Sequence, residues 1–111
     1  MAKAKIAEGL SNEIAKGVLA DCLEDGVIIQ GRHFRDEMAA EGLCFEDIWY
    51  VLRCGKIADA AELDIKTGEW KYKVEGYEPG SRWLAVVFSF KQIDTVFLIT
   101  VYSVESRRRD A

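Results

Sequence analysis

Residues 83–102 read WLAVVFSFKQIDTVFLITVY, and this stretch decides the fold. Two nearly continuous apolar runs, 83–90 and 96–102, flank a short segment of mixed polarity, a pattern typical of two adjacent antiparallel strands. Upstream, apolar and charged residues alternate over residues 69–75, which predicts a third strand with one wet face. Residues 57–63 are the candidate fourth strand. Together these runs predict an antiparallel meander.

Apolar residues occupy both faces of the two runs, whereas a half-exposed antiparallel sheet leaves every second residue polar. Both faces of these strands therefore need cover. We expect the predicted helices at 32–41 and 45–54 to cover one face. The other face requires the helix at residues 11–24, a second subunit or a partner protein.

Helix and turn signals supply the remaining elements. Apolar residues recur at helical spacing over 11–24, 32–41 and 45–54, and Ser11 is a good N-cap for the first of these helices. The apolar run at 27–29 predicts a short strand. Residues 78–81, Glu-Pro-Gly-Ser, predict a type II turn with Gly80 at positive φ. The predicted class is α+β: N-terminal helices, with one short strand, packed on an antiparallel meander sheet of about four strands.

Length and composition indicate one globular domain. The chain has 111 residues, of which 50% are hydrophobic and 31% charged. We divide it into an N-terminal helical extension (1–26), a core (27–103) and a basic tail (104–111). The formal net charge of −4 argues against a broadly basic surface that coats nucleic acid, while leaving room for a local basic cleft.

The sequence predicts a soluble cytoplasmic protein without cofactor or metal. Its N-terminus lacks the apolar run of a signal peptide, and the apolar stretch 96–102 is far shorter than the ~20 residues that a membrane helix needs. The three cysteines are an odd number with no Cys-x-x-Cys pair, which is typical of reduced thiols. A zinc site would have to recruit His33, the only histidine.

His33 is the most informative single residue. It lies at the start of the second predicted helix between Arg32 and Arg35, where the helix dipole and two guanidiniums favour a neutral imidazole. A neutral imidazole beside cations suits a general base acting on a phosphate ester, and the two arginines suit a phosphate clamp. The alternatives are a histidine packed over the helix start and arginines paired with Asp36 or Glu37. We interpret the carboxylates of this helix as a solvated face.

The strands carry further candidates. Lys71 and Lys73 share one face of the predicted strand at 69–75, where cross-strand ion pairing is the alternative to phosphate binding. Thr100 and Tyr102 point the same way on the last strand, and their hydroxyls either bond a neighbour or line a cleft. The run Arg107–Arg109 suits RNA phosphates or an acidic partner, or is a solvated tail.

The layout resembles a bacterial family of small uncharacterised domains. The residues that carry the resemblance extend over 27–103 and include Ile28–Gly31, His33–Met38, Glu41–Leu43, Glu46–Ile48, Val51–Ile57, Asp64–Gly68, Trp70–Tyr72, Leu84–Phe90 and Leu98–Tyr102. That family is similar in layout to RelE-, BrnT- and MqsR-type toxins, many of which cleave mRNA without a metal and are held inactive by an antitoxin. The resemblance implies a RelE-like, toxin-like core.

Carried over residue by residue, the resemblance points to His33, Thr100 and Tyr102 as catalytic, with Arg35 and Lys71 as weaker matches. The first hypothesis is therefore a metal-independent endoribonuclease of a toxin–antitoxin module. Its base is His33, its acid or orienting group is Tyr102, and its phosphate ligands are Arg32, Arg35, Lys71 and Lys73. The expected partners are an antitoxin, mRNA or the ribosome, and a second copy of the chain, with no membrane.

Two other hypotheses stay open. RelE-type nucleases are generally basic, whereas this chain is acidic, and this favours a non-catalytic protein-binding or regulatory module that acts as a homodimer or in a partner complex. A small-ligand binder that uses the cleft between helices and sheet is the third hypothesis.

Overall fold

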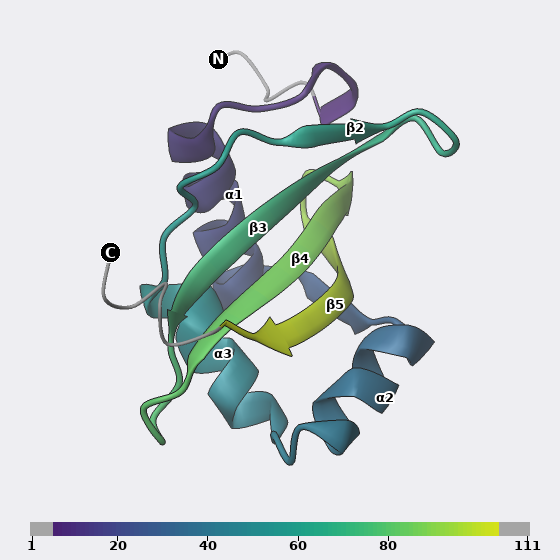
Figure 1. The fold of residues 1–111 in the computed structure, drawn as a ribbon. Coiled ribbons are helices and arrows are strands. Elements are labelled where there is room, and N and C mark those ends of the chain that lie inside the picture. Colours follow the sequence, from purple (N-terminus) through teal and green to yellow (C-terminus); the bar gives the residue numbers. More distant parts are fainter. Residues whose placement is uncertain (1–5, 105–111) are drawn as a thin grey trace.

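The computed structural model describes residues 6–104, which form three α-helices and five strands after a short 3-10 helix (Figure 1). In chain order the elements are the 3-10 helix Ile6–Glu8, α1 Asn12–Asp25, β1 Val27–Gln30, α2 Arg32–Ala40, α3 Phe45–Cys54, β2 Glu62–Asp64, β3 Glu69–Tyr77, β4 Trp83–Gln92 and β5 Thr95–Ser103. The three helix predictions are confirmed to within about two residues at each end. Ser11 caps α1 as predicted, its side chain accepting from the Ile14 backbone N–H at 3.2 Å.

The five strands form one sheet in the order β1-β5-β4-β3-β2. β2 to β5 are the predicted antiparallel meander. The short strand β1 adds a fifth member that runs parallel to β5, so the sheet is mixed. The predicted strand at 57–63 is mostly wrong, because within this range only Glu62 and Leu63 pair with β3. The preceding Ala-Asp-Ala-Ala segment consists of poor strand formers.

Helices α1 and α3 both pack on the same face of the sheet, behind β3 to β5 in Figure 1. The core lies there and is built from residues Ala15, Leu19, Cys22, Leu23, Phe34, Ile48, Val51, Leu52, Tyr72, Val74, Leu84, Val86, Phe88, Phe90, Val96, Leu98 and Val101. α2 follows β1 at the edge of the sheet and contacts β5. The first helix therefore does not cover the second face of the sheet, contrary to one of the options above.

On the second face, which we call the open face, described side chains themselves cover several central positions. Ala85 and Ser89 are fully buried. The Lys91 ammonium lies 4.9 Å from the centre of the Phe97 ring, so the lysine stem covers apolar surface. Long polar side chains thus supply part of the cover that we expected from a helix, and a covering subunit or partner stays a prediction.

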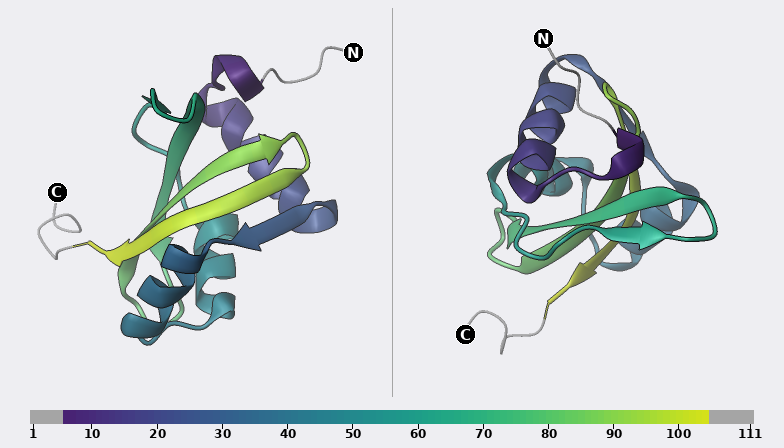
Figure 2. Two further views of the ribbon diagram at one scale, coloured as in Figure 1. Left: turned by 90° about the vertical axis from the view of Figure 1, so that its right-hand side faces the viewer. Right: turned by 90° about the horizontal axis from the view of Figure 1, so that it is seen from above.

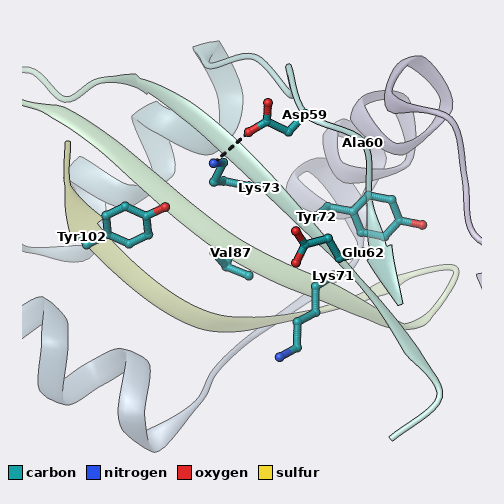
Figure 3. A pocket seen from close by; sticks show the side chains of 8 residues that line it. All are labelled: Asp59, Ala60, Glu62, Lys71, Tyr72, Lys73, Val87 and Tyr102. Atoms are coloured by element: carbon teal, nitrogen blue, oxygen red, sulfur yellow. Dashed lines mark ion pairs between the residues drawn. The ribbon is translucent and has the colours of Figure 1, made fainter. Parts of the chain in front are cut away.

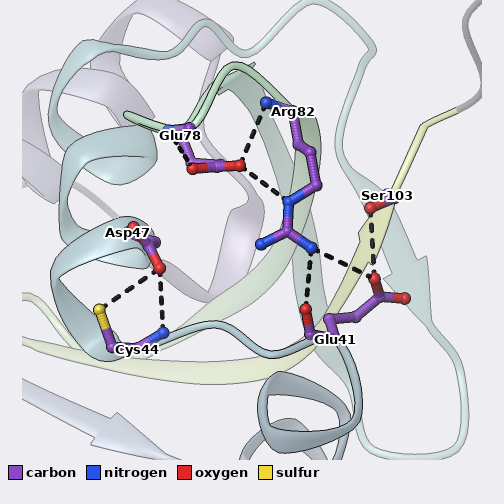
Figure 4. Close-up of polar contacts among 7 residues, drawn as sticks. Glu41, Cys44, Asp47, Glu78, Arg82 and Ser103 are labelled. Atoms are coloured by element: carbon purple, nitrogen blue, oxygen red, sulfur yellow. Dashed lines mark hydrogen bonds and ion pairs between the residues drawn. The ribbon is translucent and has the colours of Figure 1, made fainter.

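The turn between β3 and β4 is not of type II, since Ser81 rather than Gly80 has positive φ (77°). The Glu78 carboxylate accepts from the backbone N–H groups of Gly80 and Arg82, which fixes a different turn. Arg82 also donates from Nη1 to the Glu41 carbonyl at 2.8 Å and so ties this turn to the end of α2 (Figure 4).

Candidate functional site

A chain of polar contacts joins the start of α2 to the last strand. The His33 side chain is 72% exposed, and its Nε2 lies 3.2 Å from Oε2 of Glu37, one helical turn further on. The other oxygen of Glu37 accepts from the Thr100 hydroxyl and from the backbone N–H of Val101, the latter at 3.0 Å. Two predicted site residues, His33 and Thr100, therefore share one carboxylate.

The position of Glu37 follows from the end of β1. Pairing between β1 and β5 stops at Leu98, so beyond that point no strand of the described part of the chain lies along this edge of β5. The Val101 N–H there needs an acceptor, and α2 supplies the carboxylate of Glu37. The interpretation of Glu37 as part of a solvated face is wrong. The four-residue spacing from His33 is the sequence signal that would have singled it out.

Tyr102 lines a pocket of about 240 Å³ on the open face (Figure 3). The lining residues are Asp59, Ala60, Glu62, Lys71, Tyr72, Lys73, Val87 and Tyr102. Val87 pairs in register with Lys73 on one side and with Thr100 on the other. Thr100 therefore stands between the pocket and the Glu37 carboxylate, and three predicted residues, Lys71, Lys73 and Tyr102, meet in the pocket itself.

Both pocket lysines are paired with acids. Lys73 Nζ lies 2.9 Å from Asp59 and 3.3 Å from Glu75, and Lys71 Nζ lies 3.2 Å from Asp64. The hydrogen bond to Asp59 raises the pKa of Lys73 above its ordinary value, although burial opposes this shift. The predicted cross-strand pairing thus exists in part, but two of the acids come from residues 59–64 rather than from β3 itself.

The predicted arginines lie outside this pocket. Arg32 and Arg35 on α2 are exposed, and neither forms an ion pair with another residue in the range 6–104. Their alternative reading, pairing with Asp36 or Glu37, is therefore not observed, and Glu37 contacts His33 instead. The run Arg107–Arg109 lies outside the described residues.

Metal ligands do not cluster in the part of the chain that the structure describes: it contains no group of three or more His, Cys, Asp or Glu side chains suited to an ion. The cysteines are free, with Cys22 buried and Cys44 and Cys54 exposed. Burial raises the pKa of the Cys22 thiol to about 11. None of the helices within residues 6–104 is long and apolar enough to span a membrane.

The fold resembles that of a solved protein, the ribonuclease toxin BrnT of Brucella abortus. The TM-score is 0.51 at 19% sequence identity, over 72% of this chain and 97% of that one. No curated protein matches this chain significantly in sequence. Residues 30–103 match the family model described as Domain of unknown function (DUF4258). The resemblance to a small uncharacterised family with a toxin-like fold is thereby confirmed, and the chain belongs to the DUF4258 family.

Proposed function

We propose that this protein is a toxin-like endoribonuclease that cleaves mRNA in the cytoplasm without a metal and is held inactive by an antitoxin. In this proposal residues 27–103 are the toxin-like core and residues 1–26 a helical extension. The observation that carries the proposal is the contact chain His33–Glu37–Thr100 beside the Tyr102 pocket. The fold of a protein named a ribonuclease toxin supports it further.

Metal-independent RNA cleavage requires a base, an acid and cations around the phosphate. In the proposed reaction His33 removes the proton of a ribose 2′-hydroxyl, whose oxygen then attacks the adjacent phosphorus. The bond to the 5′-oxygen breaks, that oxygen receives a proton from Tyr102 or from water that Tyr102 orients, and a 2′,3′-cyclic phosphate remains. Glu37 orients the imidazole, and Thr100 holds Glu37.

Four cations are assigned to the phosphates: Arg32 and Arg35 on α2, and Lys71 and Lys73 in the pocket. The arginines make no ion pair with another described residue, so they are available at once. The lysines have to exchange Asp64 and Asp59 for a phosphate. RNA binding should therefore weaken steeply as the salt concentration rises.

The test is RNA cleavage by the purified protein in EDTA. A positioned general base contributes about 100-fold or more, so His33→Ala should lose at least that factor in rate. Asp36→Ala is the matched control, since this exposed residue lies on the same helix and forms no ion pair with another described residue. Equal cleavage by wild type and His33→Ala would exclude His33 as the base.

A second function, a non-catalytic protein-binding or regulatory module, is favoured by the lysine–acid pairs that neutralise the pocket. Expression in a bacterial host separates the two. A toxin arrests growth and His33→Ala relieves the arrest, whereas a binding module forms a stable complex without arrest.

A further inference from the structure

The outer edge of β1 has no strand beside it within residues 6–104. β1 is the first strand of the sheet order, and β5 is its neighbour (Figure 2). The N–H of Val27 donates to the Asp94 carbonyl at 2.8 Å, and that of Gly31 to the Leu98 carbonyl at 3.1 Å. Since bonding alternates along a strand, the N–H and C=O groups of Ile28 and Gln30 point away from β5. These groups are a template for another strand.

The side chains of this edge are apolar in the middle and oppositely charged at the two ends. Val27 and Ile29 are 52% and 40% exposed. Asp25 is the last residue of α1 and Arg32 the first of α2; both are exposed, and neither is ion-paired within residues 6–104. An acid at a helix C-terminus and a base at a helix N-terminus each oppose the helix dipole, so each would gain from an opposite charge nearby.

We propose that a second copy of this chain pairs its β1 with this edge, antiparallel and across a twofold axis. Residues whose backbone N–H and C=O groups point away from β5 must lie opposite each other. This register sets Ile28 opposite Gln30 of the second copy, and Ile29 opposite Ile29 of the second copy. Each Ile28–Gln30 pair forms two backbone hydrogen bonds. The antiparallel direction brings Asp25 of each copy close to Arg32 of the other, which satisfies both charges.

The two sheets then continue as one. Because the axis of such a pair is perpendicular to the sheet, both open faces lie on the same side of the dimer. The side chains of Val27 and Ile29 lie on the same side of the sheet as Phe97. Near the twofold axis of the dimer, the second copy covers them. The inference does not depend on the proposed ribonuclease activity. In the dimer Arg32 pairs with Asp25 of the other copy, so Arg35, Lys71 and Lys73 remain for the phosphates.

Sedimentation velocity over a range of concentrations tests the charge pairs. The wild type should pass from a monomer of 12.5 kDa to twice that mass. Asp25→Arg and Arg32→Asp should each weaken the dimer about 10- to 30-fold, because two attractive pairs become repulsive. The double variant should return to within about threefold of wild type. Asp25→Arg places a base at a helix C-terminus and Arg32→Asp places an acid at a helix N-terminus, and both changes are favourable to the helix dipole. Loss of the dimer therefore does not come from loss of folding, and circular dichroism of each variant verifies that the fold is retained.

Amide hydrogen exchange tests the strand pairing itself. In the dimer the amides of Ile28 and Gln30 should become protected as concentration rises, while that of Ile29, which faces β5, is protected in monomer and dimer alike. A monomer up to about 1 mM overturns the proposal. So does a dimer in which Ile28 and Gln30 exchange freely or in which the double variant stays as weak as the single ones, because the copies then meet elsewhere.

Discussion

The shared carboxylate of Glu37 allows a quantitative test of how α2 is held on the sheet. Glu37→Ala removes the acceptor of the Val101 N–H and of the Thr100 hydroxyl, and the first of these lies at a part-buried strand edge. A net hydrogen bond is worth about 1 kcal/mol, and leaving a part-buried donor unpaired adds to this, so we expect a loss of about 2 kcal/mol in the free energy of unfolding. Urea unfolding followed by tryptophan fluorescence should show a midpoint lower by about 1–2 M.

Two further variants separate the contacts. Glu37→Gln keeps an oxygen for Val101 and should lose about 1 kcal/mol, and Thr100→Val removes only the hydroxyl and should lose about 0.5–1 kcal/mol. The double variant Glu37→Ala/Thr100→Val should lose less than the sum, by about 0.5–1 kcal/mol, because both single changes break the same contact. If Glu37→Ala unfolds at the wild-type midpoint, or if the two changes are additive, the carboxylate does not join α2 to β5.

Three more outcomes are expected. At pH 8 a thiol reagent should label the two exposed cysteines at once and Cys22 only after unfolding, since burial raises its pKa to about 11; a count of labelled thiols by mass spectrometry checks this. Burial alone would raise the pKa of Glu78, but hydrogen bonds from Arg82 and Gly80 outweigh burial and lower this pKa below its ordinary value of 4.5. The stability that Glu78 contributes is therefore present above pH 4.5 and is lost as the pH falls further. In acid unfolding, Glu78→Gln should lose less stability below pH 4.5 than the wild type does. Asp59→Asn with Asp64→Asn removes two of the three acids beside the pocket lysines and leaves only Glu75 beside Lys73. RNA binding should therefore tighten about 3- to 10-fold at low salt, measured by fluorescence anisotropy, and unchanged affinity would mean that the pocket does not bind RNA.

Periodicity sufficed for the elements that depend on local pattern. Helices α1 and α3 each bury a stripe of apolar residues at helical spacing, and β4 and β5 are the two nearly continuous apolar runs, so both patterns are visible in the sequence. The position of β1 was not predictable in the same way. Its four residues predict a strand but not a partner, because parallel pairing with β5 depends on contacts between segments about 68 residues apart.

The side chains of the candidate site also divide into those predictable from local pattern and those that depend on long-range contacts. Thr100 and Tyr102 could be assigned to one face because the period of a strand is two. The four-residue spacing from His33 points to Glu37 among the carboxylates of α2, but its bonds to β5 were not predictable, since they depend on where β1 ends beside β5. The same holds for Asp59, which reaches Lys73 from a segment without regular structure.

The acidic net charge of this chain is therefore a weak argument about the open face. The charge of −4 is a sum over the molecule, whereas a phosphate responds to charges within about one Debye length, ~8–10 Å. Around the pocket Lys71 and Lys73 face Asp64 of β2, Asp59 of the preceding loop and Glu75 of β3 itself. Of these three acids only Asp59 lies outside the strands, so a displacement of its loop would remove one of the two carboxylates beside Lys73. The sign of the local field therefore depends on these few neighbours rather than on overall composition.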